Sequence, residues 1–351
     1  MEMIEIIITQ LIVFNLSYAV IKKISLFNLF LDDNFNKLQS FHKVVTPRVG
    51  GVLIFFSFII SVSIFLEITQ FYYMIILFMI VNFILGTLDD IKIIVNPFVR
   101  LFLFFIFNIL LIIFFDLNVK EFKVFFLDYL NTFYFFSILI TFFCIFFIVN
   151  GSNLIDGFNG LLGIHILLIL GLLAFISFEY IQEEFLTINL TLILAISIFL
   201  FFNIPNAKIF LGDGGSYLLG SYASILIINL YNQSVNISPF FFAIIIFYLF
   251  FEIFFSVFRK IFQKKNPFYP DRKHLHMLLY KYLQLSKIKF ENYNFLTSII
   301  INIFYSVLVF PSIFFYENNF LCKIYFIFLI IIYLLLYFYL NYTININEKK
   351  N

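Results

Sequence analysis

The chain of 351 residues is 63% hydrophobic and only 12% charged, with a mean hydropathy of +1.05. A soluble domain is about 25% charged, so this composition excludes a soluble globular protein and indicates an integral membrane protein. The formal net charge of +2 gives no reason to expect nucleic-acid binding, and Cys144 and Cys322 fit neither a zinc pattern nor a disulfide framework.

The first apolar run extends from Met3 to Val20. Glu2 and Glu5 lie at its start, and it lacks a basic leading segment and a small-residue cleavage site. We therefore expect a membrane helix here and not a signal peptide. A spanning helix needs roughly 20 mostly apolar residues. We predict eleven such helices, at about 3–21, 50–66, 71–88, 98–115, 133–149, 161–178, 187–203, 217–231, 239–258, 295–315 and 322–341.

The sequence thus predicts an all-α, polytopic protein that forms a single membrane domain over residues 1–351. If the N-terminus is outside, all but three of the 22 basic residues lie on the inner side, as the positive-inside rule expects. The exceptions are Lys120, Lys123 and Lys323. An odd number of helices then places the C-terminus inside.

Polar segments interrupt the apolar runs, and the helix count places all of them on the inner side of the membrane. Ionisable groups near helix ends are costly there and are retained mainly for function, so this arrangement indicates an active site at one membrane face. The segments are Thr46–Gly51, Asp89–Asp90, Asn150–Gly160, Gly212–Ser216 and Asp271–His276.

Asp89 and Asp90 end the third predicted helix, where the helix dipole and their mutual repulsion both disfavour negative charge. A cation or a proton donor would relieve both penalties, although a solvated helix stop is an equal alternative. Gly212-Asp213-Gly214-Gly215-Ser216 opens a helix whose free N–H groups suit a phosphate. Asp213 suits Mg²⁺, and the alternative is a glycine-rich turn with an aspartate cap.

The stretch from Asn150 to Gly160 is longer than the four or so residues that a simple turn needs, which indicates a ligand loop. His274 and His276 fit either a metal or a diphosphate beside Arg272, and a merely basic loop explains them poorly. We expect His165 to pack between helices. Glu252, an acid within an apolar run, is expected to be a pair partner near the inner interface, with Arg259 on roughly the same helical face.

Taken in order, these segments resemble those of the polyprenyl-phosphate N-acetylhexosamine-1-phosphate transferases, glycosyltransferase family 4. The resemblance covers residues 42–280, which we expect to form the catalytic region, with its site at the cytoplasmic face. The matching stretches are His42-Lys43 with Thr46-Pro47-Arg48-x-Gly50-Gly51, Gly86-x-x-Asp89-Asp90, Asn153-x-x-Asp156-Gly157-x-Asn159-Gly160, Asn203-x-Pro205-Asn206-Ala207-Lys208-x-x-x-Gly212-Asp213-x-Gly215-Ser216 and Pro267-Phe268-x-Pro270-Asp271-Arg272-x-His274-x-His276.

The resemblance implies an enzyme of the bacterial inner membrane, a sugar-1-phosphate transferase. The phosphate of undecaprenyl phosphate attacks a UDP-N-acetylhexosamine, and UMP leaves, as a first step of O-antigen, teichoic-acid or other cell-envelope polysaccharide synthesis. By resemblance, Asp213 binds Mg²⁺, with Mn²⁺ as an alternative, while Asp89 and Asp90 contact the lipid phosphate and one of them deprotonates it. The implied substrate-binding residues are Lys43, Arg48, Asn153, Asp156, Asn203, Lys208, Arg272, His274 and His276.

Two positions depart from the family pattern. Asn159 stands where the family often has a second acid, and Met277 stands where it often has a further histidine. We expect Asn159 to influence the choice of sugar, and the spacing of His274 and His276 is closer to the O-antigen and teichoic-acid enzymes. The alternatives are the phospho-MurNAc-pentapeptide translocase of peptidoglycan synthesis and, in another class, a transporter or flippase, which predicts ionisable residues at the bilayer midplane and an internal repeat. A homodimer is left open.

Overall fold

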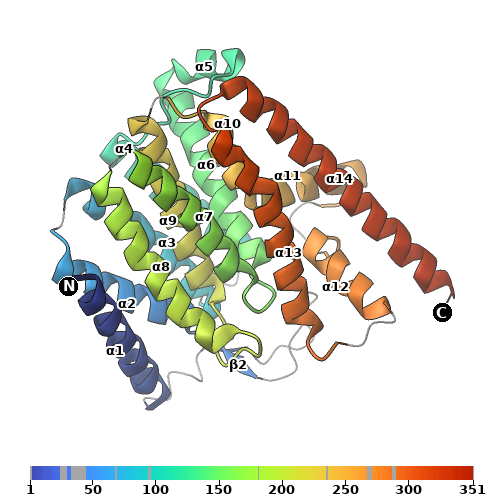
Figure 1. Cartoon of the computed structure of the whole chain (residues 1–351), viewed down its shortest axis with the longest axis horizontal. Coiled ribbons are helices and arrows are strands. Elements are labelled where there is room, and N and C mark those ends of the chain that lie inside the picture. The colour runs from blue at the N-terminus through green and yellow to red at the C-terminus, as the bar shows by residue number, and fades with distance from the viewer. Residues whose placement is uncertain are drawn as a thin grey trace.

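The protein is a bundle of helices with one short pair of strands, β1 and β2, at its lower end (Figure 1). The computed structural model describes residues 2–23, 30–32, 45–67, 69–93, 96–180, 182–234, 236–266, 271–286 and 290–350. The elements are α1 (Glu2–Lys23), β1 (Leu31–Asp32), β2 (Thr46–Pro47), α2 (Gly50–Phe65), α3 (Gln70–Asp90), α4 (Pro97–Phe115), α5 (Phe125–Asn131), α6 (Tyr134–Ile155), α7 (Leu161–Glu179), α8 (Glu183–Asn203), α9 (Gly212–Gln233), α10 (Pro239–Ile245), α11 (Phe247–Phe262), α12 (Leu275–Leu285), α13 (Tyr293–Val309), η2 (Phe310–Phe314) and α14 (Asn319–Lys350).

Every predicted apolar run is helical, and the polytopic membrane architecture is confirmed. Within the described ranges, eight helices are long and apolar enough to span a membrane, or nine if the bent pair α10 and α11 forms one span. The count of eleven stays a prediction. It includes α2, which has only 16 residues, and α9, whose glycines and polar serine and asparagine side chains make it less apolar.

The predicted helix 239–258 is wrong as a continuous rod. It breaks at Ile246 into α10 and α11, which meet at an angle of 79°. A broken helix in a membrane must satisfy the backbone groups that the break releases. The hydroxyl of Tyr305, on α13, donates to the carbonyl of Ile245 at this break. Because of this break, α11 runs in a different direction from α10 (Figure 1).

The centre of the bundle is α9, which is buried along almost its whole length against α3, α6, α2 and α7. Glycines allow this packing because they let two backbones approach each other. A Cβ atom on Gly51 of α2 would lie 2.3 Å from the Cα of Gly215, and one on Gly86 of α3 would lie 2.3 Å from the carbonyl oxygen of Asp213. The start of α9 is thus held between α2 and α3.

Backbone hydrogen bonds also tie the start of α2 to the segment before α9. The first N–H groups of a helix have no partner within the helix. Here the N–H groups of Gly50 and Gly51 donate to the carbonyls of Phe210 and Leu211, both at 2.8 Å. Phe210 in turn donates to the carbonyl of Pro47 at 2.8 Å. Two polar segments that are remote in sequence are joined in this way.

A pair of buried amides sets the register of α3 and α4. Asn82 and Asn108 each donate to the side-chain oxygen of the other, at 3.1 and 3.0 Å. Interhelical hydrogen bonds of this kind contribute about 0.6 kcal/mol in membranes. Within α4, Asn108 is one of three buried residues, and a second one, Phe104, packs on the rings of Phe142 and Tyr217.

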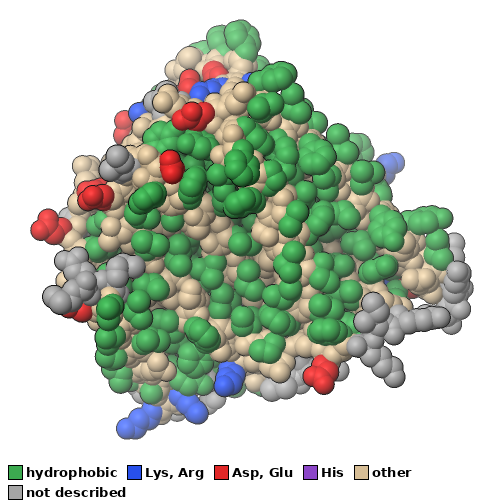
Figure 2. All heavy atoms as spheres, viewed as in Figure 1, with side chains coloured by type: hydrophobic (Ala, Val, Ile, Leu, Met, Phe, Trp, Pro, Cys, Tyr) green, Lys and Arg blue, Asp and Glu red, His purple; other side chains and the backbone are tan. Residues whose placement is uncertain are grey.

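Polar contacts gather at both ends of the bundle. The start of α9 and the residues just before it meet the start of α2 and the last turns of α3 and α6, whereas the last turn of α9 accepts the side chain of Lys120 at the carbonyl of Asn232. Twenty-two residues of helix separate these ends by about 30 Å. In Figure 2 acidic side chains gather toward the upper end and several basic ones lie at the lower end. Four of the five polar segments, Thr46–Gly51, Asp89–Asp90, Asn150–Gly160 and Gly212–Ser216, therefore share the lower end.

The close packing of α2 on α9 gives a stability prediction. In Gly51→Ala the new Cβ atom meets the backbone of Gly215, so α2 must shift, and we expect a loss of about 1–3 kcal/mol in the free energy of unfolding. Gly171→Ala is the matched control, because a Cβ atom there meets nothing within 4 Å. Thermal unfolding of both variants in detergent measures the difference, and equal melting temperatures would show that the two helices are not packed through glycine.

Candidate functional site

Carboxylates from three elements converge at the lower end of the bundle. Asp89 and Asp90 end α3, Asp213 lies in the first turn of α9, and Asp156 follows α6. Asp89 and Asp213 are direct neighbours, and Asp156 is within electrostatic range of Asp90 and Asp213. We call these four acids, with Arg48 and Arg100, the acid cluster.

Asp90 is the structural centre of this cluster. Its two carboxylate oxygens accept the backbone N–H groups of Asp213 and Gly214, at 3.0 and 2.9 Å. The residue before α9, Leu211, supplies no side-chain cap, so Asp90 caps α9 from a different helix. The sequence indicated that the free N–H groups at this helix start suit a phosphate, and two of them are bound by the Asp90 carboxylate.

The two adjacent aspartates therefore have different environments. The side chain of Asp90 is 2% exposed and holds the end of α9, whereas the side chain of Asp89 is 27% exposed. Asp89 forms a close ion pair with Arg100. Sequence alone treats the two acids as equivalent, and burial makes Asp89 the one that a substrate can reach.

Two arginines neutralise part of this charge. Arg48 lies 3.5 Å from Asp90 and 3.7 Å from Asp213, and Arg100 lies 3.3 Å from Asp213 as well as against Asp89. Arg100 was missed as a site residue. The available signal was a charged residue in the first turn of an otherwise apolar helix, α4, close in sequence to Asp89 and on the same predicted side.

The loop between α6 and α7 is shorter than the predicted stretch from Asn150 to Gly160. Helix α6 continues to Ile155, so Asn153 lies on its last turn and the connection spans only residues 156–160. Asn153 donates to the hydroxyl of Ser216 at 3.1 Å, which brings it beside the start of α9. Burial, reinforced by the charge of Asp213, raises the pKa of Asp156 to about 8.

Two asparagines brace the loops around the site. Asn203 is buried, accepts the N–H of Gly160 at 2.6 Å and donates to the carbonyl of Ile209 at 2.9 Å. Asn159 donates to the carbonyl of Pro205 at 2.9 Å. The structure thus places Asn203 as a brace and not at a substrate surface, and the side chain of Asn159 is engaged in the same way. Lys208 is exposed on the connection between α8 and α9.

The predicted histidines belong to a second group of polar residues. His274 is buried and its Nδ1 lies 3.0 Å from Glu252 Oε1, while Glu252 Oε2 accepts the hydroxyl of Tyr333 at 2.8 Å. Nδ1 of His276 lies 3.1 Å from the hydroxyl of Tyr248. We call Tyr248, Glu252, Arg259, Asp271, His274, His276 and Tyr333 the histidine network.

The predicted partnership of Glu252 with Arg259 is wrong. Arg259 instead binds both oxygens of Asp271, at 2.8 and 3.2 Å, and donates to Ser256 at 3.1 Å. Burial alone would raise the pKa of Asp271. The hydrogen bonds and charge of the Arg259 guanidinium lower the pKa by more than burial raises it, so the net shift is downward and this acid remains ionised. Arg272 is exposed beside it.

The histidine network and the acid cluster meet at the short loop 156–160. Asp156 belongs to the acid cluster, whereas the ring of Phe158 packs edge to face on His276 with ring centroids 5.6 Å apart. Burial lowers the pKa of His276 to about 3, so its ring is neutral, and its Nε2 has no hydrogen-bond partner within the described ranges. Met277, the second departure from the family pattern, is buried.

The acid cluster has the charge that a divalent cation needs. When fully ionised, its four carboxylates face two guanidinium groups, which leaves an excess of negative charge. Within the described residues no three His, Cys, Asp or Glu side chains form an all-protein metal site. Mg²⁺ does not require one, because it is commonly bound by one or two carboxylates, waters and substrate phosphates. Asp89 and Asp213, as neighbours, fit that role.

Two parts of the predicted site lie outside the described residues. They are Lys43, expected at the lipid phosphate, and residues 267–270, which begin the histidine motif. His165, expected to pack between helices, is buried and lies 3.1 Å from the side-chain oxygen of Asn302 on α13, so that prediction is confirmed.

Comparison with known proteins adds a family to this geometry. The family model of glycosyl transferase family 4 matches residues 72–231. That span contains every aspartate of the acid cluster together with Arg100 and Asn153. Arg48 and the histidine network lie outside it.

Curated relatives of two kinds match the chain. A phospho-N-acetylmuramoyl-pentapeptide-transferase of Dictyoglomus turgidum is 36% identical over 201 residues, which cover 54% of this chain and 61% of the relative. An undecaprenyl-phosphate alpha-N-acetylglucosaminyl 1-phosphate transferase of Thermotoga maritima is 34% identical over 139 residues, 38% of this chain and 41% of the relative. A probable enzyme of the second kind from Bacillus subtilis is 34% identical over 131 residues, 37% of this chain and 36% of the relative.

These matches span about six tenths or less of the relatives' own length. The family model and all three relatives agree on the class of enzyme, a transferase. Over residues 72–231 the chain is similar to glycosyl transferase family 4, and the curated relatives that it matches are named as transferases.

Proposed function

We propose that this protein transfers an N-acetylhexosamine 1-phosphate from a UDP-sugar to undecaprenyl phosphate and releases UMP. The observation that carries the proposal is the acid cluster at one end of a membrane-embedded bundle, with two arginines beside it. Both substrates are anions, and phosphoryl transfer depends mostly on positioning them and neutralising their charge. A site that a lipid phosphate reaches from the bilayer, and a nucleotide from water, must lie at such an end.

Roles follow from exposure and contacts. Asp89 is the accessible acid, so we assign it to the lipid phosphate, where it accepts the proton of that phosphate. Asp90 has its oxygens engaged at the start of α9 and acts by positioning Asp213. Bound Mg²⁺ would neutralise the phosphates that meet at Asp213.

The arginines are assigned to the phosphates as well. Arg48 and Arg100 pair with aspartates through long or shared contacts, and each keeps a side chain about one fifth to one quarter exposed. When a cation and a diphosphate enter, these guanidinium groups can exchange a carboxylate oxygen for a phosphate oxygen at little cost. Asn153 and Asp156 would then lie on the nucleotide side, and the neutral His276 offers its unpaired Nε2 to the donor.

A second donor is favoured by one observation. The relatives named as pentapeptide transferases match over a longer stretch of this chain than the N-acetylglucosaminyl 1-phosphate transferases do. Their chemistry is the same, and the donor sugar carries a peptide. The His274-x-His276 spacing favours the smaller donor, so we keep UDP-N-acetylhexosamine as the proposal and the larger one as the alternative. Location in a bacterial inner membrane, with the acid cluster facing the cytoplasm, belongs to the same proposal.

A transporter is less well supported. It requires ionisable residues that face a pathway near the bilayer midplane. Glu252, the acid within an apolar run, is 1% exposed and engaged by His274 and Tyr333. Its charge is thus enclosed in a network and does not line a path.

The metal assignment predicts the behaviour of Asp213→Asn. Removing this carboxylate takes away charge at the point where the phosphates meet, so we expect the rate of UMP release to fall by about 100-fold or more and the Mg²⁺ requirement to rise. The assay uses purified protein, undecaprenyl phosphate and UDP-GlcNAc. Asp116→Asn is the control, because it removes an equal charge from an exposed residue at the other end of the bundle. Undiminished release by Asp213→Asn would refute the assignment.

A panel of donors decides between the two readings of the substrate. We expect UMP release from at least one UDP-N-acetylhexosamine and none from UDP-MurNAc-pentapeptide, because a site built for the smaller donor has no room for the peptide. Release from the pentapeptide donor alone would make the alternative correct. Release from no donor at all would overturn the proposed function.

The pKa of Asp156 predicts a dependence of stability on pH. In the folded protein the pKa of Asp156 is raised to about 8, whereas in the unfolded chain this carboxyl loses its proton above about pH 4. Between these values the folded state alone holds the proton, so the free energy of unfolding decreases as pH rises from about 4 to about 8. Asp156→Asn mimics the protonated form. Without Mg²⁺, its melting temperature should change less over this range than that of the unaltered protein or of Asp116→Asn, and an unchanged slope would contradict the raised pKa.

A further inference from the structure

A buried acid on α11 has no place in the acid cluster. Glu252 is 1% exposed, and Glu252, Ser256 and Arg259 follow one face of the helix at spacings of four and three residues. An ionisable side chain buried in a membrane domain is costly and needs partners for each of its oxygens. Both oxygens of Glu252 have such partners, and none lies on α11.

The first oxygen of Glu252 holds the histidine motif. Oε1 lies 3.0 Å from Nδ1 of His274 and accepts the backbone N–H of Leu275 at 3.1 Å. A carboxylate can only accept, so Nδ1 of His274 carries the proton. Leu275 is the first residue of α12, and the residue before that helix supplies no side-chain cap of its own. Glu252 is therefore the cap of α12 and the anchor of its first histidine.

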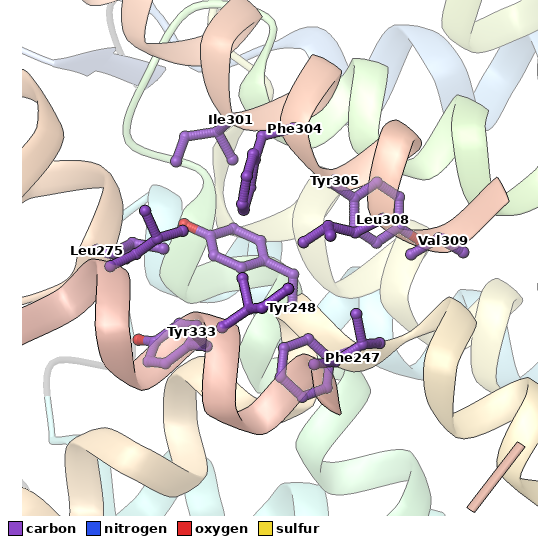
Figure 3. A pocket seen from close by; sticks show the side chains of 12 residues that line it. Phe247, Tyr248, Leu275, Ile301, Phe304, Tyr305, Leu308, Val309 and Tyr333 are labelled. Carbon is purple, nitrogen blue, oxygen red and sulfur yellow. The ribbon is translucent and has the colours of Figure 1, made fainter. Parts of the chain in front are cut away.

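The second oxygen of Glu252 is held by the C-terminal helix. Oε2 accepts the hydroxyl of Tyr333, on α14, at 2.8 Å. Figure 3 shows the rings of Tyr333 and Tyr248 at an apolar cavity between α11, α13 and α14. The hydroxyl of Tyr333 binds Glu252, and the hydroxyl of Tyr248 binds Nδ1 of His276. Each tyrosine therefore has an apolar ring at the cavity and a polar hydroxyl in the histidine network. The two tyrosines thus separate the apolar cavity from the polar residues.

The geometry of the two imidazoles depends on this arrangement. With Nδ1 turned to Glu252, Nε2 of His274 lies 3.6 Å from Asp271, and the ring stacks on that of His276 at 5.6 Å with an interplanar angle of 6°. His276 in turn contacts Phe158 in the loop beside the acid cluster. A displacement at Glu252 would pass to both rings and to the loop.

We propose that Glu252 is a positioning residue that holds His274 and the start of α12 in place for the donor, and that Tyr333 of α14 completes this anchor. The inference rests on the proposed function, because it assumes that His274 and His276 meet the donor. It assigns a part in the site to α14, which lies outside the region that the family model matches. It also gives the two charged residues of α11 different partners: Glu252 binds His274, and Arg259 binds Asp271.

Kinetics test the proposal through two substitutions. Tyr333→Phe removes one hydrogen bond and keeps the ring at the cavity, so we expect the KM for the UDP-sugar to rise about fivefold. Glu252→Gln removes the charge that holds His274, and we expect a rise of about 30-fold. In both variants the KM for undecaprenyl phosphate should stay unchanged, because the acid cluster is intact. That split distinguishes positioning of the donor from a general loss of structure.

The matched control is Tyr337→Phe. Tyr337 is also buried and lies one turn further along α14, and its ring, which phenylalanine retains, lies 6.0 Å from the Arg259 guanidinium. We expect this variant to keep both KM values. If Tyr333→Phe and Glu252→Gln also keep the donor KM, or if both substrates lose affinity equally, the proposal is wrong.

Hydrogen exchange gives a readout that does not depend on turnover. The backbone N–H of Leu275 is bound by Glu252, so amides 275–278 should exchange about tenfold faster in Glu252→Gln than in the unaltered protein. Equal exchange would overturn the anchor. If the unaltered protein releases UMP from no donor, the proposed function fails, and exchange alone then decides whether Glu252 holds this segment.

Discussion

The whole site depends on one hydrogen-bonded contact between helices, in which the Asp90 carboxylate accepts two N–H groups at the start of α9. A helix start buried in a membrane domain needs acceptors for those donors, and an anion there also matches the helix dipole. Because α9 is the central helix, this contact fixes α3 against it and places Asp89 beside Asp213. Glycine contacts on both sides of α9 make so close an approach sterically possible.

Charge explains why the remaining residues gather around that contact. Aspartates brought together at the end of a bundle repel one another, so the fold must supply cations or keep a proton on one acid. Arg48 and Arg100 supply part of the compensation from α2's leading segment and from α4. The raised pKa of Asp156 shows that this compensation is incomplete at that acid. The same imbalance is what makes the site suited to a divalent cation and to phosphates.

Local pattern predicted the helices and several features of the site well. Asp89 and Asp90 end a helix as expected, and Asp213 opens one. Polar composition misled at Asn153, because asparagine on a last helical turn and asparagine in a loop have the same local signature. Spacing misled at Glu252, since it compares residues on one helix, whereas the partners come from α12 and α14.

The sequence by itself determined that this is a helical membrane protein, which residues are chemically able to act, and the order of motifs that indicates the family. These are properties of composition and of near neighbours. The tertiary structure alone decided that Asp90 is a cap and Asp89 an accessible acid, that Arg100 joins the site, and that Asn203 is a brace. Each depends on contacts between residues far apart in the chain, and such contacts exist only once the helices have packed.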